Sequence, residues 1–303
     1  MGGEQAHPAR SGGVTRRLLA LVAPLMLVLA VPASASAAKE LKTNPVKEFL
    51  LSPWIPIHLG PLDLSITKAV VYLLIAAVVA VGGTLLIVRG GLRIRPGRSQ
   101  AVAELVYGFA ESQIGKAALP PKVFKTWFPY LATLFVFIWV SNLISFLPLP
   151  LNTEHKVWGI PTPGFYAATS NISVTLALTL VTFFASHYVG VKHNGPIGYL
   201  KSWFPPIKGP INFLIVPLEI LSQLLRLVSL SVRLFANMLA GHLLVIMCIS
   251  LIVIIGNVFV AAISIPIGAA FFVFEVTLVA SLQAFIFALL SGIYIGGAAE
   301  PHH

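Results

Sequence analysis

The sequence predicts an all-α polytopic membrane protein with about five membrane helices, and composition is the first reason. The chain of 303 residues is 57% hydrophobic and only 10% charged, whereas soluble domains carry about 25% charged residues. The apolar residues gather in runs long enough to cross a bilayer as helices. The net charge of +10 lies largely in loops beside these runs, as cytoplasmic loops require. Nucleic acid is therefore not an expected partner.

Residues 1–37 are predicted to be a secretory signal peptide. Arg16 and Arg17 precede an apolar stretch at 18–31, and small residues follow in "PASASAAKE", which is the order of regions in such peptides. A short uncleaved membrane helix is the alternative; a mitochondrial transit peptide fits less well because the apolar run is continuous. Residues 38–68 contain four prolines and are expected to form an extracytoplasmic N-terminal arm.

Three single-span helices are predicted next, at 69–88, 127–147 and 169–191. The first ends in "RGGLRIRPGR", and the positive-inside rule assigns this basic block to the cytoplasm. The N-terminus of the mature chain is then expected outside. The stretch at 99–126 has apolar residues at helical spacing among charged ones, which predicts an amphipathic cytoplasmic helix at the membrane surface.

The predicted membrane domain at 69–299 ends in two apolar segments that are each too long for an upright crossing. They run from 211 to 255 and from 257 to 297. Each would be about 60 Å long if wholly helical, which is about twice the hydrocarbon thickness. Either each segment breaks into two spans, or the pair is strongly tilted. The uncharged join near Gly256 predicts a tight hairpin.

Polar residues in the first long segment follow a helical pattern. Glu219, Arg226 and Arg233 are spaced seven residues apart, so they lie within about 20° of one stripe. Asn237 falls close to that stripe, whereas His242 lies near the opposite face. Two different neighbours could therefore use this helix.

Arg233 is the residue that points most directly to a function. A guanidinium at the bilayer centre costs about 2.5–3.5 kcal/mol on insertion scales, and arginine cannot escape this cost by deprotonation. Snorkelling to the membrane surface is the alternative, but Arg233 lies well inside the apolar run. Arg226 has a simpler explanation as a partner of Glu219 or Gln223 that holds a helix bundle together.

Glu275 is the one carboxylate of the second long segment before Glu300. An unpaired carboxylate in hydrocarbon takes up a proton or finds a partner, and His242 is a plausible partner across the hairpin. Packing alone could also explain His242, and hydrogen bonds between helices could explain Glu275 and Gln283.

Two stretches, "SLSVRLFANMLAGH" and "SLQAFIFALLSGIYI", resemble the C-terminal signatures of the a subunit of F-type ATP synthases. The resemblance covers roughly residues 43–297 and implies a long tilted hairpin at 211–297 that faces a rotating c-ring. The implied partners are the c-ring, the b subunits of the peripheral stalk, the rest of the F1Fo complex and the lipid bilayer. The chain has no P-loop, so no nucleotide, cofactor or metal is expected on it, and ATP chemistry belongs to other subunits.

The resemblance also implies roles for individual residues. The essential arginine of the family falls on Arg233. The implied half-channel residues are Asn237, His242, Glu275, Gln283, Glu219 and Arg226. Two positions depart from the family pattern: Leu227 replaces a common proline, and Glu275 lies eight residues before Gln283 instead of the usual seven. A shift of one residue rotates a position on an α-helix by about 100°.

The implied mechanism is proton translocation through two half-channels that are open to opposite sides of the membrane. A proton from outside reaches a carboxylate of the c-ring, and it leaves to the cytoplasm after the ring has turned. Arg233 lies between the half-channels, favours proton release from the carboxylate and prevents a direct leak. The residues of this chain alone do not decide between proton and sodium.

The residues of the chain are also compatible in part with two other functions. A secondary transporter for an anionic solute fits the buried charges, but the paired halves often found in such transporters are absent. An intramembrane hydrolase lacks a G-x-S-x-G or H-E-x-x-H motif. The expected location is the bacterial plasma membrane, with the N-terminus outside and the C-terminus cytoplasmic; an organellar energy-transducing membrane is the alternative.

Overall fold

The structure, a computed structural model, describes most of the chain from residue 53 to residue 300. The described residues are 53–55, 58–59, 62–63, 65–89, 94, 97–147, 149–157, 160–164, 166–202 and 212–300. The chain divides into a unit at Met1–Asn44 and a second at Pro45–His303, and every described residue belongs to the second. The expected signal peptide at 1–37 and most of the expected arm at 38–68 lie outside these residues.

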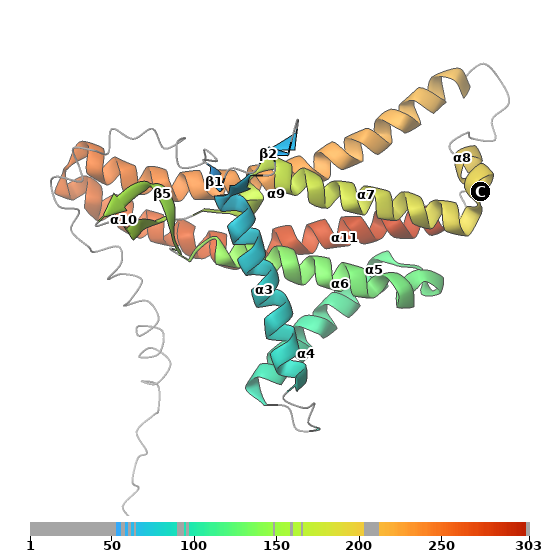
Figure 1. Ribbon diagram of the computed structural model, residues 1–303, viewed down its shortest axis with the longest axis horizontal. Coiled ribbons are helices and arrows are strands. Elements are labelled where there is room, and N and C mark those ends of the chain that lie inside the picture. Colours follow the sequence, from blue (N-terminus) through green and yellow to red (C-terminus); the bar gives the residue numbers. More distant parts are fainter. Residues whose placement is uncertain are drawn as a thin grey trace, which may run out of the picture. The chain divides into compact units, whose positions relative to one another are not determined.

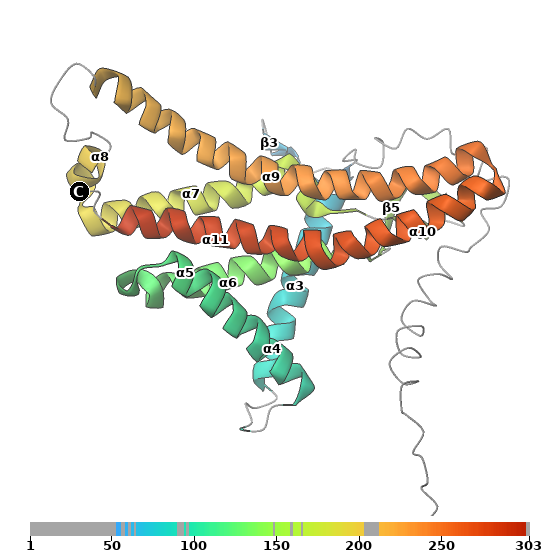
Figure 2. The ribbon, with the colours of Figure 1, turned by 180° about the vertical axis from the view of Figure 1, so that it is seen from behind.

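Five helices of the described chain are long and apolar enough to cross a membrane, which confirms the predicted all-α polytopic fold. The first three are α3 (Lys68–Arg89), α6 (Pro121–Ile144) and α7 (Ile172–Asn194). The bounds of α3 match the expected span within one residue at each end. Figures 1 and 2 show α6 and α7 running alongside the C-terminal helices.

The beginnings of α6 and α7 differ from the expected ones for local reasons. Helix α6 starts six residues before the expected position, because Pro121 occupies its first turn, where a missing N–H breaks no helical bond. Helix α7 starts three residues after the expected position, because a 3-10 turn, η3 (Ala168–Ser170), comes first. The side chain of Asn171 then caps α7 by accepting a hydrogen bond from the Ser173 amide at 2.8 Å.

The expected surface helix is also present, as α4 (Arg98–Phe109), the π-helical η2 (Ala110–Gly115) and α5 (Lys116–Ala118). The remaining short helix is α8 (Pro196–Ser202). Short antiparallel strands pair before α3 and between α6 and α7. They are β1 (Pro53–Ile55) with β4 (Ile66–Thr67), β2 (His58–Leu59) with β3 (Leu62–Asp63), and β5 (Leu149–Val157) with β6 (Ile160–Gly164).

The two long C-terminal segments form one helical hairpin, so the alternative in which each breaks into two spans is wrong. Helix α9 (Asn212–Ile255) is continuous over 44 residues. The return helix consists of α10 (Val258–Phe274), the π-helical η4 (Glu275–Val279) and α11 (Ala280–Ala299) without a break. Gly256 makes the turn with a φ of 62°, a conformation that costs glycine little. Figures 1 and 2 show the two arms side by side near this turn.

A stripe of small residues allows α11 to pack closely against its neighbours. The stripe repeats every fourth position and consists of Ala280, Ala284, Ala288, Gly292 and Gly296, all buried. A Cβ on Gly292 would lie 2.8 Å from a methyl of Leu131 in α6, and one on Gly296 would meet the backbone carbonyl of Ala118. Small residues serve this purpose in membrane helix pairs because they let backbones approach.

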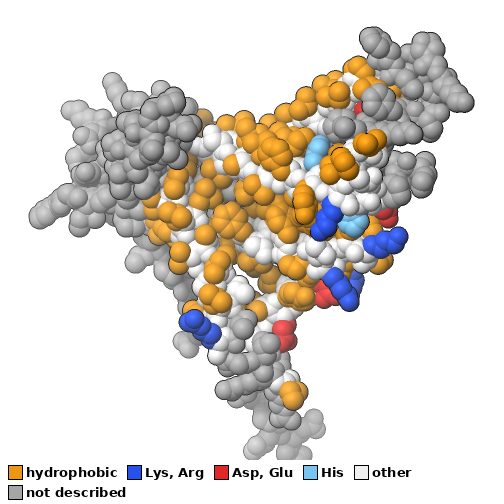
Figure 3. Space-filling model, turned by 45° about the vertical axis from the view of Figure 1, so that its right-hand side comes forward, with side chains coloured by type: hydrophobic (Ala, Val, Ile, Leu, Met, Phe, Trp, Pro, Cys, Tyr) orange, Lys and Arg blue, Asp and Glu red, His pale blue; other side chains and the backbone are white. Residues whose placement is uncertain are grey.

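Much of the described surface is apolar. The most exposed hydrophobic side chains of α3 include Val78 and Leu86, which are 71% and 73% exposed. Figure 3 shows hydrophobic side chains covering most of one face, with few charged ones. Such a surface suits contact with lipid and confirms a multi-pass membrane protein.

The close packing of the small-residue stripe of α11 can be tested by adding a methyl group to one of its glycines. We expect Gly296→Ala to destabilise the chain by roughly 1–3 kcal/mol, because the added methyl overpacks against a backbone atom that cannot rotate away. The measurement is the melting temperature of the purified protein in detergent. Gly297→Ala is the matched control, since a Cβ there meets nothing within 4 Å. Equal melting temperatures for the two variants would contradict this account of the packing.

Candidate functional site

A buried histidine and a buried glutamate meet across the hairpin. His242 lies on α9 and Glu275 begins η4, and each side chain is only 3% exposed. The Nδ1 atom of His242 is 2.9 Å from Oε1 of Glu275. The structure thus brings together the two residues that the sequence suggested as partners. Burial without a partner would be costly for either group in its charged form.

Among the described residues, both hydrogen bonds of the His242 ring are made by its Nδ1 atom. Its Nδ1 atom also lies 3.1 Å from the backbone carbonyl oxygen of Met238. A carbonyl and a carboxylate both accept hydrogen bonds, so Nδ1 carries a hydrogen and donates it. Nε2 of His242 and Oε2 of Glu275 are buried without a partner in the described chain. Each member of the pair therefore retains one polar atom whose hydrogen-bonding capacity is unused among the described residues.

The surroundings of the pair are tight and mostly apolar. The ring of Phe146 lies 5.0 Å from the His242 ring, centroid to centroid. A cavity of about 20 Å³ remains beside the pair, and its other walls include Phe272 and aliphatic side chains of α9. A Cβ on Gly241 would collide with the Glu275 carboxylate. Glycine at 241 therefore creates the space in which the carboxylate reaches the imidazole.

Arg233 occupies a different face of α9. Its side chain is exposed, whereas His242 is buried, as the helical spacing predicted. The polar side chain nearest to it is Ser229, with Nη2 and Oγ 3.4 Å apart. In the part of the chain that the structure describes, no carboxylate forms an ion pair with Arg233. Asn237, one turn further on, is exposed as well.

Besides Ser229 and Asn237, the exposed side chains near Arg233 include apolar ones. Val228 and Val232 are 50% and 39% exposed, and Leu225 is 57% exposed. A guanidinium stays protonated and is costly in hydrocarbon, and the described residues supply no carboxylate that compensates it.

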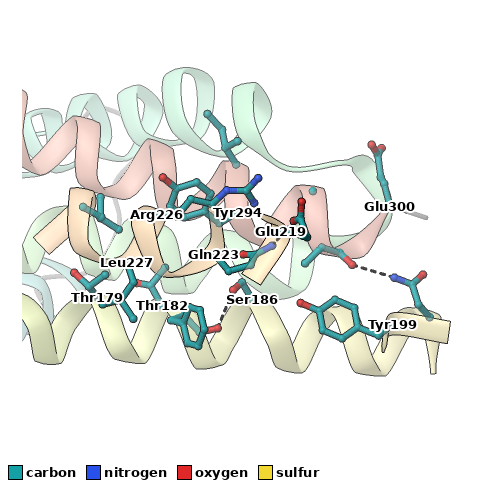
Figure 4. Close-up of a pocket in the computed structure, with 16 residues that line it drawn as sticks. Thr179, Thr182, Ser186, Tyr199, Glu219, Gln223, Arg226, Leu227, Tyr294 and Glu300 are labelled. Carbon is teal, nitrogen blue, oxygen red and sulfur yellow. Dashed lines mark hydrogen bonds between the residues drawn. The ribbon is translucent and has the colours of Figure 1, made fainter. Parts of the chain in front are cut away.

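Glu219 and Arg226 line a polar cavity near the other end of α9. The cavity measures about 470 Å³ and lies between α7, α9 and α11, where Figure 4 shows it. Gln223 donates a hydrogen bond to Glu219 at 3.1 Å. The guanidinium of Arg226 lies 5.8 Å from the ring centre of Tyr294. Among the described ion pairs there is none between Arg226 and Glu219, so the structure does not contain the pairing that the sequence suggested as the simpler explanation.

Comparison with known proteins decides the family. A model of the family described as "ATP synthase A chain" matches residues 70–296. The ATP synthase subunit a of Rubrobacter xylanophilus is 35% identical over 260 residues, which cover 82% of this chain and 91% of that protein. The ATP synthase subunit a of Brucella ovis is 35% identical over 265 residues, which cover 86% of this chain and 99% of that protein. The chain belongs to the ATP synthase A chain family.

The π-helical segment accounts for the one unusual spacing in this member of the ATP synthase A chain family. Glu275 lies eight residues before Gln283, one more than the family pattern implies. The segment η4 spans Glu275–Val279, and a π-bulge accommodates one additional residue within a helix. Glu275 and Gln283 are consequently both buried, at 3% and 6% exposure, despite the rotation expected for a regular α-helix.

Sequence reasoning missed two residues that hold this part of the helix in place. Asn142 on α6 is fully buried and donates a hydrogen bond to the carbonyl of Ala280 at 3.1 Å. Its amide oxygen accepts a bond from Thr169 at 2.8 Å. Trp139 donates to Ser281 at 3.0 Å. A lone asparagine inside an apolar span is the signal that could have drawn attention to Asn142, since buried amides need partners.

The role of Gly241 in positioning the pair is testable. We expect Gly241→Ala to push the Glu275 carboxylate away, so that the distance from Nδ1 to Oε1 exceeds about 3.5 Å, the limit for a hydrogen bond. The measurement is this distance in a structure of the variant. The control is Gly108→Ala, where a Cβ meets nothing within 4 Å. A distance that stays at 2.9 Å, the value of the native pair, would show that Gly241 does not set the geometry.

Proposed function

We propose that this chain is the ion-translocating stator subunit of an F1Fo ATP synthase, and that it provides two proton half-channels. The observation that carries the proposal is Arg233, an exposed cation on an apolar face with no ion-pair partner in the described chain. It lies between two polar sites on the same helix. Membership of the ATP synthase A chain family supports this function.

The order of the polar sites along α9 supports two separate half-channels. His242 lies nine residues after Arg233, about 13 Å further along the helix axis. Arg226 lies seven residues before Arg233, about 10 Å in the other direction. None of the residues lining the cavity beside His242 also lines the cavity beside Arg226. The two sites are therefore separate among the described residues, as two half-channels require.

The outer half-channel uses the His242–Glu275 pair as a relay, with Gln283 and Asn237 as further polar groups along it. A proton taken up at Nε2 of His242 allows Nδ1 to pass its own hydrogen to Oε1 of Glu275 across the 2.9 Å hydrogen bond, and Glu275 then carries the proton onward.

Arg233 acts on the rotor. The chain that faces it is the c-ring, whose carboxylate arrives protonated through lipid and meets the guanidinium. The fixed positive charge favours the ionised carboxylate and hence release of the proton. The same charge repels cations that would pass directly between the half-channels. A membrane potential of 100 mV supplies about 2.3 kcal/mol for each charge that crosses.

The inner half-channel is the polar cavity that contains Glu219 and Arg226. Its hydroxyl-bearing wall comes from α7 and includes Thr182 and Ser186. A proton released near Arg233 leaves through this cavity toward the ends of α7 and α11.

The proposed function also includes the other partners of the chain and its orientation in the membrane. The chain works within the F1Fo complex beside the c-ring, the b subunits and lipid. The basic ends of α3 (Arg89) and α7 (Lys192) support a cytoplasmic location for those ends. The five spans then leave the N-terminus outside and the C-terminus in the cytoplasm. Both relatives named above are bacterial proteins, which favours the bacterial plasma membrane over an organellar membrane.

Removing the guanidinium tests this function. We expect Arg233→Ala to lower ATP synthesis driven by a proton gradient at least 100-fold, because loss of a partner from a buried ion pair costs about 3–5 kcal/mol. Passive proton leak through the membrane sector should rise. Both quantities are measured in inverted membrane vesicles, with and without the soluble head. Arg98→Ala, outside the predicted spans, controls for loss of an arginine, and normal synthesis by Arg233→Ala would rule out the function.

We expect a change in the His242–Glu275 relay to affect proton flux differently from loss of Arg233. We expect Glu275→Gln to lower proton flux about 10-fold or more, because an amide keeps the shape of the side chain but takes up no proton. Unlike loss of Arg233, this change should not increase passive leak. The measurement is ATP-driven acidification of the vesicles. Thr277→Val, an exposed position on the same segment, is the control, and equal pumping by both variants would remove Glu275 from the path.

A further inference from the structure

A second hollow adjoins the inner cavity, and the two share a wall. The second hollow measures about 350 Å³ and is lined by leucines of α9 together with Ser222 and Ser229. Of the described residues that line the two hollows, Arg226 and Tyr294 alone line both. These two side chains contact each other, with the guanidinium 5.8 Å from the ring centre. They form the partition between the hollows.

The second hollow extends to the neighbourhood of Arg233. Ser229 lines it, and the hydroxyl of Ser229 is 3.4 Å from Nη2 of Arg233. The hollow faces outward on α9, where Leu225 and Val228 are exposed. A proton released from the rotor beside Arg233 would thus meet this hollow first and the Arg226–Tyr294 partition next. The polar cavity with Glu219 lies on the far side.

Arg226 lies over the ring of Tyr294 and not in an ion pair with Glu219 among the described residues. Glu219 lies seven residues before Arg226 on the same stripe of α9, and the two carry opposite charges. Yet the hydrogen-bond partner of Glu219 is Gln223, and Arg226 lies over Tyr294 instead. Figure 4 shows Arg226 beside Tyr294, with Glu219 and Gln223 nearby. A guanidinium within about 6 Å of a ring centre is attracted by the ring's negative face.

We propose that Tyr294 is a positioning residue of the inner half-channel, an inference that rests on the proposed function. Its ring holds Arg226 in the partition and away from Glu219. Glu219 then keeps a carboxylate that is free to take up the leaving proton. Without the ring, Arg226 pairs with Glu219, neutralises it and slows the exit of protons to the cytoplasm.

The test is a double-mutant cycle on the assembled complex in inverted vesicles, with ATP-driven proton pumping as the readout. We expect Tyr294→Leu to lower the pumping rate about 3- to 10-fold, the range that a cation–π contact supports. Tyr294→Phe keeps the ring and should stay within about twofold of the native rate. Arg226→Gln removes the cation that would block Glu219. The double variant should therefore pump as fast as Arg226→Gln alone, because Tyr294 acts through Arg226.

Controls separate a loss of the contact from a general loss of structure. Tyr188→Leu removes an aromatic ring with a similar contact, since Lys192 lies 5.7 Å from its ring centre, but Tyr188 lines neither hollow. Tyr294→Met, which has about the volume of leucine but a longer, more adaptable side chain, should show the same loss if Tyr294→Leu assembles poorly. The amount of chain in the purified complex normalises every rate.

Three results would overturn the inference. They are pumping by Tyr294→Leu equal to that of Tyr188→Leu, a loss in Tyr294→Phe as large as in Tyr294→Leu, and a double variant slower than Arg226→Gln. Arg233→Ala is measured alongside, so that failure of the proposed function can be told apart from failure of the role of Tyr294. If Arg233→Ala pumps normally, the proposed function fails; if it is inactive and one of the three results occurs, only the role of Tyr294 fails.

Discussion

A guanidinium that cannot lose its proton, held outward on an apolar helix face, is the constraint on which the rest of the structure depends. Arg233 is exposed, and the described chain offers it one serine hydroxyl and no carboxylate. A lone cation is costly in hydrocarbon unless a group of opposite charge compensates it. In the proposed function that group is the carboxylate of the rotor, so the stator is electrostatically incomplete by itself.

Helix α9 meets this constraint by separating its polar groups between faces and along its length. His242 faces inward and pairs with Glu275, so the outer polar site is covered by protein. Arg226 and Glu219 open on the polar cavity near the beginning of the helix. A continuous helix of 44 residues keeps these sites at fixed distances from Arg233. A break in the middle of α9 would uncouple them.

The sequence is sufficient to predict the all-α membrane fold, because that fold is encoded in local patterns. Long apolar runs define the spans, and the nine-residue separation of Arg233 and His242 correctly assigns them to different faces of α9. The start of α6 was misjudged because Pro121 and the lysines after it resemble a loop, although proline suits a first helical turn.

Other features depend on contacts that spacing alone does not encode. The π-helical segment at Glu275 alters the rotation of every later residue relative to α9, and no local signal in an apolar run predicts it. The space that Gly241 leaves for a carboxylate from another helix is visible only when both helices are in place. Likewise, the sequence offered Glu219 and Gln223 as partners for Arg226, whereas packing of α11 brings Tyr294 to it.

The most direct test of the central claim is a structure of the assembled complex that measures the distance from the Arg233 guanidinium to the nearest carboxylate of the neighbouring chain. The account predicts a rotor carboxylate that faces Arg233 within direct or single-water reach, about 3–6 Å, at the depth of the membrane core. A guanidinium that faces lipid or bulk water, with no acidic group of another chain beside it, would contradict the account.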